Sequence, residues 1–257
     1  MGWNRSNFFD RHLRRLRLKY WQSAAGRAPH MVSGELRKLR ADARQIRREM
    51  DRILQVAELR LTQPFVGSDA LRREPTADWA WRPNLWRVPV APIGIVAAED
   101  HAALDAETRI HHDGKTSEIA LRQLRNTGAE DLSPFGLRID VLAFGGSFVS
   151  LTIELPKEAA RGLRLNQLVR LDLTVEAERP TQINARLNIR HGPNTEQLIV
   201  GLPSGDGEKT AEFDLAYTKL NERRVEQAWV DLFFDPPEMN QIILRDVAFS
   251  RRPRADL

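Results

Sequence analysis

A strict alternation of apolar and polar residues constrains the fold of this chain more than any other feature. Between residues 169 and 177, Val, Leu, Leu, Val and Ala alternate with Arg, Asp, Thr and Glu, and the same period of two returns between residues 182 and 190. Successive side chains of a β-strand point to opposite faces of its sheet, so this period predicts strands with one buried face. The C-terminal part of the chain is therefore expected to be a β domain.

Seven further segments show strand-like patterns, and turn-forming residues such as those at 192–194 separate several of them. These segments span residues 117–125, 136–144, 147–155, 195–201, 209–217, 226–235 and 241–250. One short helix is expected at 156–162. Half-buried strands with few helices between them favour antiparallel pairing. We therefore predict a mainly β fold, in which residues 95–257 form an antiparallel, jelly-roll-like β-sandwich.

Residues 1–62 have a different character and predict a basic helical arm of two helices. Residues 1–60 contain 15 Lys and Arg against 6 Asp and Glu, a net charge of +9, whereas the remaining residues have a net charge of −5. Such an asymmetry suggests an anionic partner for the arm. The first helix, residues 3–24, is expected to pack on the protein, to lie on an anionic membrane or, as a third alternative, to bind nucleic acid. The cations expected to make the membrane or anion contact are Arg11, Arg14, Arg15 and Arg17.

The second helix of the arm carries apolar side chains at the a and d positions of a heptad repeat from Leu36 to Ala57. Acidic residues, Glu35 and Asp42 among them, fall at g, and arginines fall at e. A parallel pair of such helices places opposite charges together, whereas an antiparallel pair opposes like charges. Residues 36–57 therefore predict a parallel homodimer. The alternative is a helix folded back on the first helix or on the sheet.

Residues 63–94 form a bridge between the arm and the β domain. This bridge contains five prolines and three tryptophans, Trp79, Trp81 and Trp86. A flexible linker is rich in Gly and Ser instead. We therefore expect the bridge to run extended over the β domain with its tryptophan rings in surface grooves, although an exposed aromatic platform for sugars or bases would have the same composition.

Two of the predicted strands carry a candidate ligand-binding face. The polar face of the strand at 182–190 presents amides and guanidinium groups, which donate and accept hydrogen bonds in fixed directions. The strand at 226–235 places an aromatic ring beside a carboxylate, and one further tyrosine adds a ring. Sugar-binding sites combine such groups, although a solvated sheet face has the same pattern. The predicted ligand contacts are Asn184, Arg186, Asn188, Arg190, Tyr217, Trp229 and Asp231.

Catalytic and metal-binding motifs are weak in this sequence. The histidine pair His111 and His112 lies next to Asp113, but adjacent strand residues point to opposite faces. His191 and Glu196 flank a turn and provide only two metal ligands. Cysteine is absent, which excludes thiolate sites and disulfides. We predict no metal and no cofactor, and lean towards a protein that is not an enzyme.

Five segments of the chain resemble an uncharacterised protein family of alphaproteobacteria, of the Rhodobacter kind, that is known only as a domain of unknown function. They are Asp78–Arg82, Ala185–Gln197, Phe213–Glu222, Glu238–Asp246 and Phe249–Ala255. The resemblance extends over most of the chain and implies a bacterial, intracellular protein. It implies no activity and no catalytic residues.

The sequence thus favours a binding or scaffold protein. Its β domain is expected to recognise a glycan-like or protein ligand, and its arm to form a dimer or to contact an anionic surface. The alternatives are a carbohydrate-active enzyme with an Asp/Glu pair on the sandwich, and a nucleic-acid-binding protein acting through the arm. The expected location is the cytoplasm, with peripheral contact at the inner membrane as an option, because no apolar run is long enough to cross a bilayer.

Overall fold

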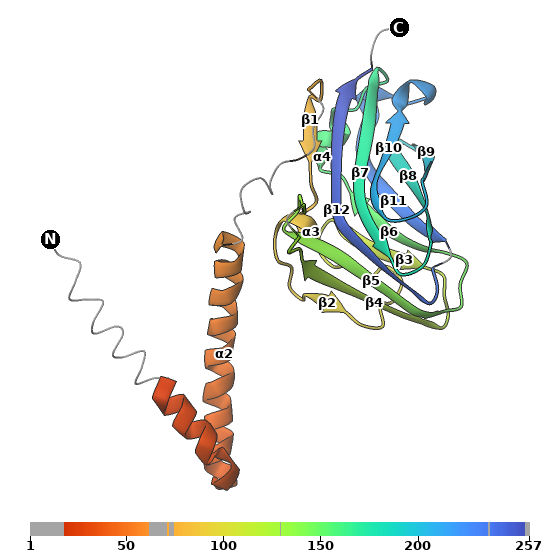
Figure 1. Ribbon diagram of the computed structural model, residues 1–257. Helices are drawn as coiled ribbons and strands as arrows, with labels where there is room; N and C mark the ends of the chain where they lie inside the picture. The colour runs from red at the N-terminus through yellow and green to blue at the C-terminus, as the bar shows by residue number, and fades with distance from the viewer. Residues whose placement is uncertain (1–17, 62–70, 72–74, 129, 236, 255–257) are drawn as a thin grey trace, which may run out of the picture. The chain divides into compact units, whose positions relative to one another are not determined.

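The computed structural model describes residues 18–61, 71, 75–128, 130–235 and 237–254. The chain divides into two compact units, residues 1–58 and residues 59–257 (Figure 1). The described residues of the first unit are mostly helical, and the second unit contains every strand of the described residues. A mainly antiparallel β fold preceded by a helical region is thereby confirmed.

The first unit is a helical arm, as predicted. Residues 18–27 are helical, a 3₁₀ turn η1 follows at Ala28–His30, and the long helix α2 spans Ser33–Leu61. Ala24 is buried in the first of these helices, whereas the described side chains of α2 are almost all exposed. The predicted contact residues Arg11, Arg14, Arg15 and Arg17 lie outside the described residues. Among the helices that the structure describes, none has the length and hydropathy of a membrane span.

The second unit is a sandwich of two antiparallel sheets (Figure 1). The seven-stranded sheet has the order β10 (Gly207–Asp214), β7 (Gln167–Ala177), β12 (Asn240–Pro253), β5 (Phe135–Phe144), β4 (Ser117–Arg125) and β2 (Gly94–Ile95), with β1 (Trp79–Trp81) also paired to β12. The five-stranded sheet has the order β3 (Thr108–His112), β6 (Val149–Glu154), β11 (Val225–Asp235), β8 (Gln182–His191) and β9 (Asn194–Leu202). From β5 onward the chain crosses repeatedly between the sheets, which is the jelly-roll arrangement.

The short helices lie at the ends and edges of these strands. They are α3 (Asn84–Arg87), α4 (Lys157–Arg161) and the 3₁₀ turns η2 (Leu215–Tyr217) and η3 (Glu222–Arg224). The helix expected at 156–162 is α4. The strand expected at 209–217 ends early, because the Asp214 carboxylate accepts a hydrogen bond from the Ala216 N–H at 3.0 Å and turns the chain into η2. The prediction of a strand at 215–217 was therefore wrong.

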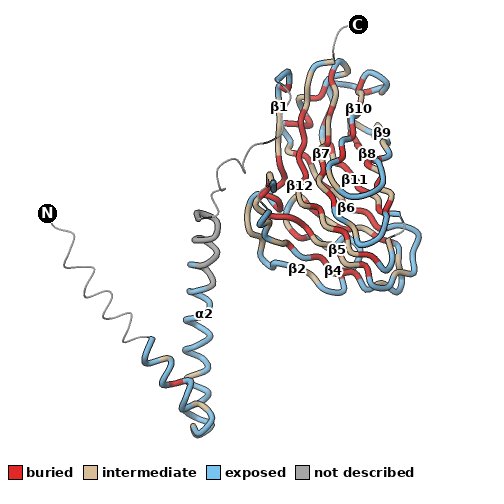
Figure 2. The backbone as a smooth tube through the Cα atoms, in the orientation of Figure 1, coloured by how far each residue is buried: buried red, intermediate tan, exposed pale blue. Residues whose placement is uncertain are grey.

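The core lies between the two sheets and is built from the apolar half of each alternating strand. In β7 every second side chain from Val169 to Val175 is buried, and Figure 2 shows the same alternation along the neighbouring strands. Burying one Leu or Val side chain contributes about 1.5–3 kcal/mol, several times more than an exposed ion pair. The alternation therefore decides which face of each sheet is free to carry a site.

The described part of the bridge packs on the β domain through its tryptophans and Arg82. Trp86 in α3 is fully buried, and its indole N–H donates to the Leu244 carbonyl oxygen at 2.9 Å. The Trp81 ring lies 5.7 Å from the ring of Phe249, measured between centroids. The buried guanidinium of Arg82 donates to both carboxylate oxygens of Asp246 at 2.8 and 2.9 Å, beside a β-bulge in β12. Bidentate pairing provides the partner that a buried charge requires.

Candidate functional site

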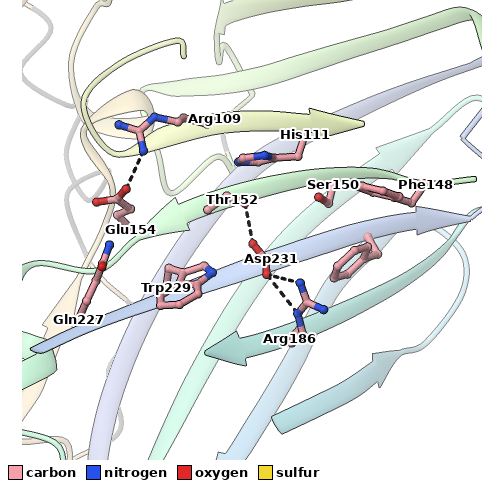
Figure 3. A pocket seen from close by; sticks show the side chains of 11 residues that line it. Arg109, His111, Phe148, Ser150, Thr152, Glu154, Arg186, Gln227, Trp229 and Asp231 are labelled. Atoms are coloured by element: carbon pink, nitrogen blue, oxygen red, sulfur yellow. Dashed lines mark hydrogen bonds and ion pairs between the residues drawn. The ribbon is translucent and has the colours of Figure 1, made fainter. Parts of the chain in front are cut away.

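An open depression of about 680 Å³ lies on the outer face of the five-stranded sheet (Figure 3). Strands β3, β6, β11 and β8 each contribute side chains to it. On β11 these are the residues at odd positions from Gln227 to Phe233, while the even positions 228–234 are buried in the core. The period of two therefore separates the side chains of the site from those of the core.

The antiparallel register places four polar side chains of the depression in one cross-strand row. Arg109 of β3 is opposite Thr152 of β6, Thr152 is opposite Asp231 of β11, and Asp231 is opposite Arg186 of β8. Directly paired side chains on one face lie close enough to interact. Four strands that are not consecutive in the sequence thus bring two cations, a hydroxyl and a carboxylate together.

Asp231 is the centre of this row. Its carboxylate is almost fully buried and accepts hydrogen bonds from the Thr152 hydroxyl at 2.6 Å and from the Asn188 amide at 2.8 Å. Arg186 donates to Asp231 Oδ2 from Nη2 at 2.8 Å and from Nε at 3.2 Å. The guanidinium also lies over the Phe233 ring, 4.7 Å from its centroid. Arg186 is therefore held in one orientation, with its Nη1 donors not engaged by any contact among the described residues.

A second ion pair lies beside the first. Arg109 Nη1 donates to Glu154 Oε1 at 2.7 Å, and Glu154 is opposite Trp229 in the register. Both side chains of this pair are more than a third exposed. Such a pair contributes only about 0–1 kcal/mol to stability, so stability alone gives little reason for it.

Three aromatic rings surround these charges. Trp229 and Phe233 are half-buried and four residues apart on β11, which corresponds to about 13 Å along a strand. Phe148 lies at the far end, 6.2 Å from the Phe233 ring between centroids. The turn before Phe148 is held by Asp113, whose carboxylate accepts from the Ser147 N–H and hydroxyl and from the Phe148 N–H. The hydrogen bond from the Ser147 hydroxyl is the main cause that lowers the pKa of Asp113.

The structure brings together four of the predicted ligand contacts. Arg186, Trp229 and Asp231 line the depression. Asn188 lies beneath them, only 1% exposed, where it donates to Asp231 and accepts from Gln197 Nε2 at 3.0 Å. Asn188 is thus placed to hold Asp231 and is not positioned as a surface contact.

The other predicted contacts lie apart from the depression. Asn184 is on the same face of β8, opposite Gly201, but does not line it. Arg190 forms an exposed ion pair with Glu226 at 3.3 Å. Tyr217 lies in η2, is 80% exposed, and has the guanidinium of Arg254 5.6 Å from its ring centroid.

Sequence reasoning missed the contribution of β3 and β6 to this site. Arg109, His111 and Glu154 line the depression and were not predicted. The alternation between 150 and 154 was visible, but only the sheet order shows that this face continues the face of β11. Burial, followed by the charge of His101, lowers the pKa of His111.

Two of the histidines that the sequence offered as metal ligands, His112 and His191, lie away from the depression. His112 is buried, with Nε2 3.1 Å from the Ala98 carbonyl oxygen. His191 Nε2 lies 3.6 Å from Glu196 Oε1, and its Nδ1 accepts from the Asn221 N–H. In the described part of the chain no further metal-ligating group joins either of them.

The comparison with protein families matches the whole chain, residues 1–257, to a family of unknown function, DUF6478. The chain belongs to this family. The predicted resemblance to a family of unknown function is thereby confirmed, while its alphaproteobacterial origin stays a prediction. No curated protein matches the chain.

Several solved structures are similar to the chain at low identity. One is the enzymatically active domain of tailspike protein 4 of bacteriophage CBA120, with 9% identity over 56% of this chain and 19% of that chain and a TM-score of 0.40. Another is a family 11 carbohydrate-binding module of Clostridium thermocellum in complex with a mixed-linked tetrasaccharide, with 9% identity over 63% of this chain and 98% of that chain and a TM-score of 0.39. A third is the CBM22-1 xylan-binding domain of Paenibacillus barcinonensis Xyn10C, with 8% identity over 72% of this chain and 100% of that chain and a TM-score of 0.36.

The chain spans only 19% of the tailspike domain and 27% of a further match, the CBM22-1 and GH10 modules of Clostridium thermocellum endo-1,4-beta-D-xylanase 10B. At these identities and scores the likeness carries no conclusion about a ligand. The ligand has to be argued from the depression itself.

Proposed function

We propose that DUF6478 members of this kind are binding proteins whose five-stranded sheet recognises a short, uncharged glycan. The observation that carries the proposal is the hydrogen-bonded centre of Asp231 and Arg186 between the rings of Trp229 and Phe233. Oriented donors and acceptors match sugar hydroxyl groups, and half-buried aromatic faces match the apolar face of a sugar ring.

The charge balance of the depression favours an uncharged ligand. Its two arginines are each paired with one of its two carboxylates, Arg109 with Glu154 and Arg186 with Asp231. An acidic ligand would have to compete with these internal carboxylates for the same guanidinium groups. A neutral ligand can use the remaining donors and acceptors without breaking either pair.

The same pairs favour binding over the hydrolytic alternative. A glycosidase needs one carboxylic acid that keeps its proton until it protonates the leaving group. The two carboxylates of the depression, Glu154 and Asp231, both accept hydrogen bonds from arginines, at 2.7 and 2.8 Å. A carboxylate engaged in this way is oriented towards its arginine and not towards a ligand.

The test is a calorimetric titration of the full chain with neutral β-linked gluco- and xylo-oligosaccharides and with an acidic uronic-acid oligomer. We expect a neutral oligosaccharide to bind and W229A to weaken it at least about tenfold, because a buried aromatic side chain contributes about 1.5–3 kcal/mol. Y217A is the matched control, since Tyr217 is exposed and outside the depression. Preference for the acidic oligomer, or release of new reducing ends, would contradict the proposal.

We also propose that the arm joins two copies of the chain in a homodimer. The apolar positions Leu36, Ile46, Met50 and Ile53 of α2 are exposed in the single chain. A second copy in parallel would cover them and would place Glu35 near Arg40 of its partner. Contact of Arg11, Arg14, Arg15 and Arg17 with an anionic membrane, binding of nucleic acid, and a cytoplasmic location remain predictions from the sequence.

A further inference from the structure

A group of three potential metal ligands lies beside the depression. Asp100 and His101 belong to the loop before β3, and His111 is on the outer face of β3. One ligand atom from each residue lies within 4.8 Å of the other two. His101 Nε2 is 3.1 Å from Asp100 Oδ2, and His111 Nδ1 is 3.7 Å from Asp100 Oδ1. Figure 3 shows His111 among the side chains that line the depression.

The backbone holds these groups in place. Asp100 Oδ1 accepts hydrogen bonds from the N–H groups of His101 at 2.9 Å and of His112 at 3.1 Å, so the carboxylate is fixed by both chain segments that meet here. His101 has a φ of 66°, a left-handed conformation that residues with a side chain rarely adopt. This conformation brings its ring to within 4.5 Å of the His111 ring, between centroids. Unusual backbone conformations of this kind concentrate at functional sites.

A simple ion pair accounts poorly for this arrangement. One exposed carboxylate needs only one cationic partner, and two protonated imidazoles held in contact would repel each other. Two neutral imidazoles and a carboxylate that converge on one point are instead the ligands that zinc and related divalent ions prefer. Calcium and magnesium prefer sites made of oxygen atoms alone.

We propose that Asp100, His101 and His111 bind one divalent transition-metal ion of the zinc class beside the depression. Three protein ligands leave one tetrahedral position for water or for a molecule bound in the depression, which His111 also lines. The proposal does not depend on glycan binding. It differs from the expectation of no metal, because His101 is ten residues from His111 and only the loop conformation brings the two together.

The test uses the untagged full chain, stripped of metal with a chelator and titrated with zinc chloride by calorimetry. We expect one zinc ion per chain, and visible absorption from a cobalt(II) complex of low coordination number. H101A and H111A should each weaken zinc binding at least about tenfold. H30A is the matched control, because His30 belongs to the arm, and its affinity should equal that of the wild type.

His101 is 72% exposed at its side chain, so H101A is expected to fold, and the thermal midpoint of each metal-free variant checks this. Absence of zinc binding, or equal affinity in the wild type and H101A, would overturn the metal site. Oligosaccharide titrations with chelator and with zinc separate the two proposals. If the chain binds sugar but not zinc, only the proposed metal site is wrong. If it binds zinc but no sugar, only the proposed glycan binding is wrong.

Discussion

Asp231 is the residue on which the geometry of the candidate site depends most. Its carboxylate accepts hydrogen bonds from three side chains, and one of these, Asn188, is buried without access to water. In D231A the Asn188 amide and the Arg186 guanidinium lose this partner. Leaving a buried donor unsatisfied costs about 1–3 kcal/mol. We therefore expect D231A to lower the free energy of unfolding by about 2 kcal/mol, measured by urea denaturation.

E154Q is the control for this change, because it removes the other carboxylate of the depression. The Arg109–Glu154 pair is partly exposed, so its loss should change the free energy of unfolding by about 1 kcal/mol or less. An equal effect of D231A and E154Q would show that Asp231 is not the structural centre of the site.

Glu107 provides a pH-dependent prediction away from the site. Burial is the main cause that raises the pKa of Glu107, and the charge of Asp105 raises it further, while the hydrogen bond from the Asn84 N–H opposes both. A carboxyl with a raised pKa in the folded state stabilises the protein below its unfolded pKa and loses this contribution as the pH rises through the folded pKa. E107Q cannot ionise, so the stability of E107Q relative to the wild type should increase as the pH rises from about 4 to about 7.

The measurement is the difference in free energy of unfolding between E107Q and the wild type at each pH. The amide side chain introduced by E107Q keeps a carbonyl oxygen for the Asn84 N–H, which Glu107 binds at 2.8 Å. A constant difference across this pH range would mean that burial does not penalise the charged form of Glu107.

At the scale of elements, the strands could be predicted because their alternation is visible in each segment of the sequence. The site could not be predicted, because it is formed by strands that are distant in the sequence. The alternation in β11 indicates that Trp229, Asp231 and Phe233 share a face. Nothing in β11 indicates that β6 and β3 lie next to it on one side and β8 on the other. Only the strand order shows that Arg109 and Glu154 lie on the same face as Trp229 and Asp231.

Helix α2 shows the same limit in another form. Its heptad pattern predicted the helix, but its exposed apolar side chains do not show which surface covers them. If a parallel homodimer forms, I46D should convert it to a monomer, because Ile46 is a d position and a charge there is buried without a partner. R48A is the control, since position 48 lies on the opposite face of the helix.

Light scattering on the full chain measures this directly. We expect a mass of twice 29.4 kDa for the wild type and R48A, and 29.4 kDa for I46D. A measured mass of 29.4 kDa for the wild type would contradict the homodimer. The net charge of +9 in residues 1–60 would then direct the next test to anionic liposomes and nucleic acid.

At the scale of the whole β domain, the two sheets have separate tasks. The seven-stranded sheet receives the bridge, through the pairing of β1 with β12 and the burial of Trp86. The outer face of the five-stranded sheet carries the depression. We therefore expect stability to depend on Trp86, which belongs to the core, and the proposed ligand binding to depend on Trp229, which lies outside the core on the outer face.

This division gives a prediction with opposite outcomes for two variants of the same type. W86A removes a fully buried ring and the hydrogen bond to Leu244, which should cost about 3–5 kcal/mol of stability. The folded fraction of W86A should still bind the oligosaccharide that the wild type binds, because Trp86 does not line the depression. W229A should lose that binding and keep most of its stability, since the Trp229 ring is only half-buried. Urea denaturation and calorimetric titration of both variants measure the two effects. If W229A destabilises the fold as much as W86A does, Trp229 is a structural residue and the depression is a consequence of packing.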